Sequence, residues 1–146
     1  MDTAVNCLVT EPILNTAQQR RHEFAAKIAD RDGEVHTDDS TVLLLAPDHA
    51  GREVYDFAVN ALGTINDACC KAPDLWGTRD VTWNSRAMAK GQIGEDEWSV
   101  EIAITFADLG GCPQVGDAWG ACLGRIAKAR KERSSWNLSK GGFHDP

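Results

Sequence analysis

The last thirteen residues, "SSWNLSKGGFHDP" (134–146), bring together side chains that could bind a ligand. Trp136, Phe143, His144 and Asp145 all lie here, and two adjacent glycines precede the phenylalanine. Such rings are unexpected near a chain end, because termini commonly fray. Aromatic rings offer a flat apolar surface, and a glycine pair lets the backbone turn with positive φ. We therefore expect this segment to fold back and present its rings on the domain.

Trp76 is a further aromatic candidate, in the loop-like segment "APDLWGTRD" (72–80). A tryptophan in a loop commonly marks a contact, because its exposure to water is costly. Trp76 could either anchor its loop or stack on a ligand. Trp136 could either close the end of the sandwich as a plug or serve as a platform for a ligand. Trp98 and Trp119 lie at strand positions that alternate into the interior, which favours a place in the core.

No constellation of catalytic residues is recognisable. A glycosidase needs two carboxylates across a cleft, and Glu97 with Glu101, or Asp38 with Asp39, match only the residue type. Adjacent acids before a strand are typical of turn and cap residues that accept backbone N–H bonds. The cysteine pair at 69–70 has no neighbouring histidine to activate it. We expect a protein that is not an enzyme.

Composition narrows the possible partners. The chain has 146 residues and a net charge of −7, and a nucleic acid would require clustered basic side chains. The basic run at 125–133 is interpreted as a solvated strand end or loop. No segment reaches the roughly 18 apolar residues of a membrane span, and the N-terminus lacks the features of a signal peptide. Five cysteines without a CxxC pair favour free or buried thiols.

The elements that must position these residues are mainly strands. Residues 97–104 alternate strictly between apolar and polar, which predicts a strand with one buried face. Residues 53–60 alternate in the same way and follow an apolar run at 40–47, which predicts a hairpin. Residues 83–90 are expected to pair with 97–104, and a further strand is expected from Asp117. The segment 105–111 is expected to form at most one helical turn.

One short helix is predicted near the N-terminus, within residues 13–33, where helix-favouring residues precede Gly33. Several short strands separated by turn signals are typical of an antiparallel sheet architecture. The sequence therefore predicts a mostly β fold, an antiparallel β-sandwich of the immunoglobulin or jelly-roll kind. Residues 1–146 are expected to form a single domain.

Six motifs occur in an order that resembles the family 9 carbohydrate-binding modules. Together they cover nearly the whole chain, and six in sequence indicate a common fold more firmly than a common ligand. They are "DDSTVLLLAPD" (38–48), "FAVNALGTINDA" (57–68), "WNSRAMA" (83–89), "WSVEIAITFADLG" (98–110), "GDAWGACLGR" (116–125) and "SSWNLSKGGFHDP" (134–146).

The resemblance implies a β-sandwich that binds sugar chains without cutting them. It implies that the partner is a plant-type polysaccharide such as xylan or cellulose, and that the domain supports a glycoside hydrolase. It further implies that the domain is part of a secreted bacterial protein, located outside the cell or in the periplasm. Family members extend further at both ends, so the chain is expected to be a fragment of a longer module, truncated before "VNCLVT" (5–10) and after "FHDP" (143–146).

Site residues follow from the resemblance by position. Two rings that sandwich a terminal sugar fall on Phe143 and His36, where the family has tryptophans. Two positions that bind sugar hydroxyls, an acid and an arginine, fall on Val42 and Ala58, so two polar contacts are expected to be lost. The candidate carbohydrate-binding residues are Phe143, His36, Trp136, Trp76 and His144.

Three further possibilities remain open. The resemblance implies structural Ca²⁺, for which the candidate ligands are Asp38, Asp39 and Asp145, although no DxDxDG-type loop is present. Relatives of the fold bind b-type haem for electron transfer, which would require Met88 opposite His144 or His36. A structural or interaction sandwich with an eroded sugar site is the third alternative.

Overall fold

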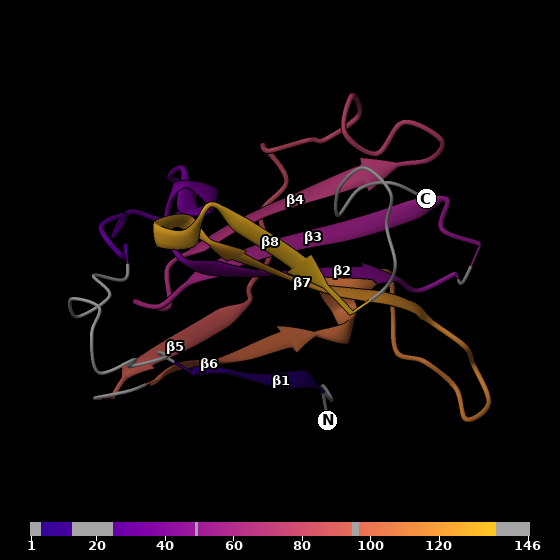
Figure 1. Ribbon diagram of the computed structural model, residues 1–146. Coiled ribbons are helices and arrows are strands. Elements are labelled where there is room, and N and C mark those ends of the chain that lie inside the picture. The colour runs from indigo at the N-terminus through magenta and orange to yellow at the C-terminus, as the bar shows by residue number, and fades with distance from the viewer. Residues whose placement is uncertain (1–3, 13–24, 49, 95–96, 137–146) are drawn as a thin grey trace.

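The computed structural model describes residues 4–12, 25–48, 50–94 and 97–136, with 4–12 described as backbone. The described strands form two antiparallel sheets that face each other (Figure 1). One sheet has the order β1-β6-β5, with strands Ala4–Pro12, Glu97–Thr105 and Met88–Ile93. The other has the order β4-β3-β2-β7-β8, with strands Ile65–Lys71, Glu53–Asn60, Ser40–Ala46, Gly120–Ala127 and Glu132–Ser135.

The main core lies between the two sheets. Leu43 and Phe57 face it from the five-stranded sheet, and Val100, Ile102 and Ile104 face it from β6. The residues of β6 that alternate with these point away from the core, so the strict alternation predicted for 97–104 is confirmed. Burial of each large apolar side chain contributes about 1.5–3 kcal/mol to stability. The predicted antiparallel sandwich is therefore confirmed.

A second apolar cluster covers the outer face of the five-stranded sheet. It contains Val42, Leu44, Val54 and Ala58 from the central strands, and Val35 from outside the sheet. Strand β3 is consequently buried on both faces after its first residue. The half-buried strand predicted for 53–60 is wrong in this respect, because a layer outside the sheet shields the second face.

The predicted N-terminal helix is wrong for the described part of 13–33. Residues 25–29 have no regular secondary structure, residues 30–33 form bends and turns, and 13–24 lie outside the described residues. The amides of Ala25 and Lys27 donate to the carboxylates of Asp39 and Asp38, at 3.1 and 2.8 Å. These tertiary hydrogen bonds replace the i to i−4 bonds of a helix. The helical residues that follow form a single 3₁₀ turn, η1 (Val35–Thr37).

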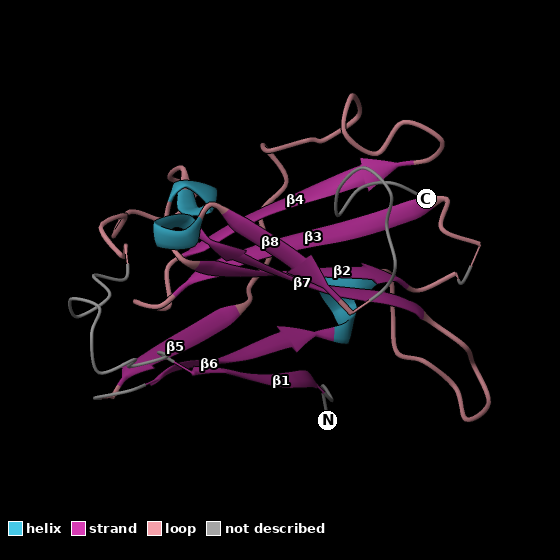
Figure 2. Cartoon of the chain, in the orientation of Figure 1, coloured by secondary structure: helices cyan, strands magenta, loops and turns pink. Residues whose placement is uncertain are grey.

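Helical structure in the described chain is limited to three such turns (Figure 2). Turn η2 (Phe106–Leu109) matches the single turn predicted there, and η3 (Lys128–Arg130) connects β7 to β8. The predicted hairpin of β2 and β3 is confirmed. The strand predicted from Asp117 is also present, but it begins only at Gly120. The strand predicted for 83–90 begins only at Met88. No described helix has the length and apolar character of a membrane span.

Candidate functional site

A hollow of about 200 Å³ opens between β2, β6, β7 and β8. The indole of Trp98, which is buried, and the hydroxyl of Thr41 form part of its lining. The Thr41 hydroxyl donates to the carbonyl of Gly124 at 3.0 Å, which fixes the approach of β2 to β7. The lining residues are Thr41, Trp98, Leu123, Gly124, Arg125, Ser134, Ser135 and Trp136.

The register of β7 and β8 places Trp136 at the wall of this hollow. The amide of Trp136 donates to the carbonyl of Leu123 at 2.8 Å, which continues the ladder one step beyond β8. Paired residues in a sheet share a face, and Leu123 itself pairs with Leu43 of the inner core. Trp136 therefore lies on the inner side of the five-stranded sheet. With 81% of its surface exposed, it is a platform beside the hollow and not a plug beneath it.

Polar groups surround this ring. Arg125 pairs with Ser134 across β7 and β8, so both share the face of Trp136. The guanidinium of Arg125 lies 3.4 Å from the carboxylate of Glu132. An exposed indole next to hydroxyls and a guanidinium can stack on an apolar ring and bind polar substituents at its edge. Among the described residues, no carboxylate lines the hollow, so a pair of catalytic acids is not present there.

The other predicted sugar-binding residues lie elsewhere. His36 belongs to η1, on the outer side of the five-stranded sheet, where its neighbour Val35 joins the outer cluster. Trp76 is 68% exposed in the loop that follows β4. In Figure 1 that loop and η1 lie at opposite ends of the sheet. The structure therefore brings neither His36 nor Trp76 to Trp136. Phe143 and His144 lie outside the described residues.

Asp38 and Asp39 bind backbone amides. Oδ2 of Asp38 accepts from the amides of Lys27 and Ile28, both at 2.8 Å, and from the side chain of Asn60 at 2.9 Å. Asp39 accepts from the amide of Ala25 through one oxygen and from that of Lys128 at 2.6 Å through the other.

These contacts are typical of cap residues. They also show whether the two carboxylates could coordinate Ca²⁺. Ca²⁺ needs six to eight oxygen ligands with lone pairs directed at it. The N–H groups that Asp38 and Asp39 accept occupy such lone pairs, so this donor set does not fit the ion. Within the described residues no group of three or more acidic, histidine or cysteine side chains could hold a metal. Asp145 lies outside the described residues.

Val42 and Ala58, the positions expected to have lost hydroxyl-binding groups, are directly paired on β2 and β3. Both are buried in the outer cluster, at 4% and 5% exposure. An apolar pair at this depth offers no hydrogen bond to a sugar. The outer face of the sheet therefore lacks polar contacts at these two positions.

Met88 and His36 are not placed to bind one haem. Met88 pairs with Ala103 on the outward face of the three-stranded sheet. His36 lies on the outer side of the opposite sheet, so the whole sandwich separates the two side chains. No observation on the described residues favours electron transfer.

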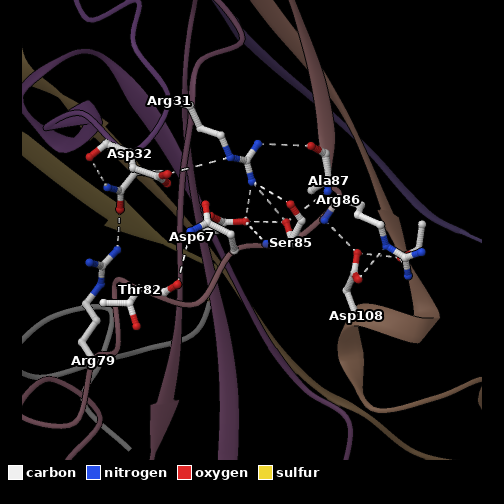
Figure 3. Close-up of polar contacts among 12 residues, drawn as sticks. Arg31, Asp32, Asp67, Arg79, Thr82, Ser85, Arg86, Ala87 and Asp108 are labelled. Atoms are coloured by element: carbon white, nitrogen blue, oxygen red, sulfur yellow. Dashed lines mark hydrogen bonds and ion pairs between the residues drawn. The ribbon is translucent and has the colours of Figure 1, made fainter.

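A polar cluster at Asp67 was not predicted from the sequence (Figure 3). Asp67 of β4 is fully buried and accepts from Arg31 at 2.8 Å and from the amide and hydroxyl of Ser85. One residue earlier, Asn66 points to the other face and bonds Arg79, whose guanidinium also pairs with Asp56 at 2.9 Å. The signal in the sequence was Asn-Asp inside an otherwise apolar stretch, which is unusual for a buried strand.

The Asp67 cluster has a structural role. Arg31 also donates to the carbonyl of Ser85 at 3.0 Å, so it connects the segment at 25–33 to β4 and to the segment before β5. A buried carboxylate must have such partners, because an unpaired charge would be costly. The carboxylate of Asp32 also lies 4.0 Å from the guanidinium of Arg31, and among the described residues the cluster includes no histidine that could activate Ser85.

Two searches by sequence gave no match, either to a protein-family model or to a curated protein. Two solved structures are similar in fold. One is a candidate carbohydrate-binding protein from Bacteroides uniformis, with a TM-score of 0.67 and 14% identity over 98% of this chain and 68% of that one. The other is a family 9 carbohydrate-binding module from Caldicellulosiruptor kristjanssonii in complex with cellotriose, with a TM-score of 0.53 and 18% identity.

The second comparison covers 92% of this chain and 58% of the module, so the chain spans under two thirds of that protein. At these identities the likeness establishes a shared fold, and function depends on the residues of the site. The class that the fold defines is the antiparallel β-sandwich found in these two proteins.

Proposed function

We propose that this chain is a non-catalytic carbohydrate-binding domain whose site is the hollow beside Trp136. The observation that carries the proposal is the exposed indole at an opening lined by hydroxyls and a guanidinium. A sandwich fold shared with two proteins described as carbohydrate-binding supports it. The expected ligand is a plant-type polysaccharide such as xylan or cellulose.

The binding energy would come chiefly from stacking. A pyranose presents one face of C–H groups, which packs on an aromatic ring through dispersion and desolvation. Ser134 of β8 and Arg125 would then bind hydroxyl groups at the sugar edge. A single exposed ring gives a weaker site than two facing rings would, so we expect modest affinity.

Such a domain would support carbohydrate catabolism by holding a glycoside hydrolase, in the same polypeptide or a partner, close to its substrate. Tethering raises the effective concentration of enzyme at the polymer without a new catalytic contact. Insoluble plant polymers are outside the cell, so the expected location is extracellular or periplasmic.

Titration with xylotetraose or cellotetraose tests the proposal. Binding should quench tryptophan fluorescence and release heat, and Trp136→Ala should abolish both responses because the stacking surface is removed. Trp76→Ala is the matched control, since it removes another exposed tryptophan from a loop outside the hollow. It should leave the affinity unchanged.

The absence of heat and quenching with both ligands at millimolar concentration would overturn the proposal. It would favour an interaction sandwich with an eroded sugar site, as the apolar pair Val42 and Ala58 suggests. Shortening of the oligosaccharides on long incubation would overturn the non-catalytic assignment.

A further inference from the structure

Positive charge is concentrated in the hairpin that carries the candidate site. Residues 120–136, here called the basic hairpin, hold five basic side chains against one acidic side chain, a local excess of four. The whole chain, in contrast, has a net charge of −7. The basic residues are Arg125, Lys128, Arg130, Lys131 and Arg133, and the acid is Glu132. A local excess of this kind attracts anions toward the surface that bears it.

The charge that lines the hollow is that of Arg125. Arg133 pairs with Ile126, which belongs to the outer cluster, so Arg133 points to the other face. Arg125 pairs with Thr41 on one side and Ser134 on the other, and all three line the hollow. Within the described residues the lining thus combines one guanidinium with an exposed indole and no carboxylate.

The spacing of these two groups matches an acidic sugar. Trp136 lies two positions beyond Ser134, the direct partner of Arg125, so Arg125 and Trp136 are diagonal neighbours on one face. Diagonal neighbours in an antiparallel pair are about 7–8 Å apart. In a uronic acid the carboxylate lies at the edge of the pyranose ring. A ring stacked on Trp136 can therefore direct its carboxylate to Arg125.

We propose that the hollow beside Trp136 prefers an acidic oligosaccharide, in which a uronic-acid ring stacks on Trp136 and its carboxylate pairs with Arg125. This inference rests on the proposed function and names the ligand class of the same site. Guanidinium and carboxylate form bidentate, charge-assisted hydrogen bonds, which are stronger than those to neutral hydroxyls. The remaining charges of the basic hairpin would speed association.

Glu132 provides an internal competitor. Its carboxylate lies 3.4 Å from Arg125, in a pair that is partly exposed on both sides. A uronate that binds Arg125 must displace this contact or share the guanidinium with it. Removal of the Glu132 charge should therefore strengthen binding of an acidic ligand and leave that of a neutral ligand unchanged.

The experiment compares two oligosaccharides of equal size by calorimetry. One is xylotetraose, and the other is xylotriose with a single glucuronic-acid branch. We expect about tenfold tighter binding of the acidic ligand, which is the effect of one charge-assisted pair. This advantage should shrink as the salt concentration rises from about 50 mM to about 500 mM.

Two variants assign the preference to the proposed groups. Arg125→Gln should make the two ligands bind with equal affinity, because the charge that favours the acidic ligand is removed. Both affinities fall as well, since Arg125 also binds hydroxyl groups of a neutral sugar, and a urea denaturation curve like that of the wild type shows that the variant is folded. Glu132→Gln should raise the affinity for the acidic ligand several-fold through loss of the competing charge. An advantage that persists in Arg125→Gln would overturn the role of Arg125.

The outcomes separate this inference from the proposed function. Equal affinity for the two ligands overturns the preference for acidic sugars and leaves carbohydrate binding in place. Failure of both ligands to bind overturns both proposals. A single-stranded oligonucleotide serves as a further arm, and tighter binding of that polyanion than of the acidic sugar would reassign the basic hairpin to nucleic acid.

Discussion

At the scale of single residues, burial separates reactive from unreactive cysteines. Burial, together with the Glu53 carboxylate, raises the pKa of the Cys69 thiol to about 11. Burial, together with Asp56, raises that of Cys70 to about 11 as well. Cys112 is exposed in the loop between β6 and β7. The expectation of free thiols is confirmed for these three and for Cys122, the cysteines whose side chains are described.

These differences predict the order of alkylation. The thiolate is the reactive form, and a thiol with a pKa of about 11 has about one thiolate in a thousand at pH 8. Iodoacetamide should therefore modify Cys112 well before Cys69 and Cys70, as measured by mass spectrometry of peptides. Denatured protein is the control and should react at all sites. Equal rates at Cys70 and Cys112 in the folded protein would contradict the burial of Cys70.

At the scale of elements, the β3–β4 turn packs directly on the backbone of β5. A Cβ atom on Gly63 would lie 2.7 Å from the amide nitrogen of Gly91, and Gly63 has a φ of +84°. A Cβ atom on Gly91 would overlap the carbonyl of Ala61. This contact brings the turn of the five-stranded sheet against an edge strand of the other sheet, so both glycines are required by close approach.

Gly91→Ala should therefore destabilise the protein. The added methyl group must displace the Ala61 backbone, and overpacking of this kind costs about 1–3 kcal/mol. Urea denaturation measures the change in the free energy of unfolding. Gln92→Ala is the control on the same strand, because Gln92 is exposed and should change stability by less than about 0.5 kcal/mol. Equal stability of Gly91→Ala and wild type would show that the turn can move away.

At the scale of the whole molecule, carboxylates attach the layer outside the five-stranded sheet. Asp38 binds the amides of Lys27 and Ile28, and Asp39 binds those of Ala25 and Lys128. Arg31 extends from the same layer to the buried Asp67. Each contact satisfies a polar group that would otherwise lose its hydrogen bonds on burial. Protein groups thereby hold residues 25–39 against the five-stranded sheet.

A calcium titration distinguishes this account from a metal site. Asp38→Ala should lower the free energy of unfolding by about 3 kcal/mol, because three donors lose their acceptor. The loss should be the same in EDTA and in excess calcium. Asp30→Ala removes an equal charge from an exposed position and should have little effect. A wild-type protein stabilised by calcium, with no such gain in Asp38→Ala, would show that Asp38 is a ligand.

The sequence predicted those elements whose structure depends on neighbouring residues, and it failed for those that depend on contacts between distant segments. Strand β6 was predictable because Trp98, Val100 and Ile102 alternate with exposed residues, and this period of two depends on local geometry alone. Strand β4 was not predicted, because Asn66 and Asp67 are buried by partners distant in the chain. The helix predicted within 13–33 failed in 25–33 because Asp38 and Asp39 take the amides that a helix would use.

The sequence by itself determined the sandwich, the inward face of β6 and the presence of Trp136 as a candidate ring. These depend on periodicity and residue type, which are local properties. The tertiary structure decided that Trp136 shares a face with Arg125, that His36 lies across the sheet from it, and that Asp38 and Asp39 bind amides. The physical reason is that strand register and sheet order set which side chains meet, and both depend on pairing between distant segments.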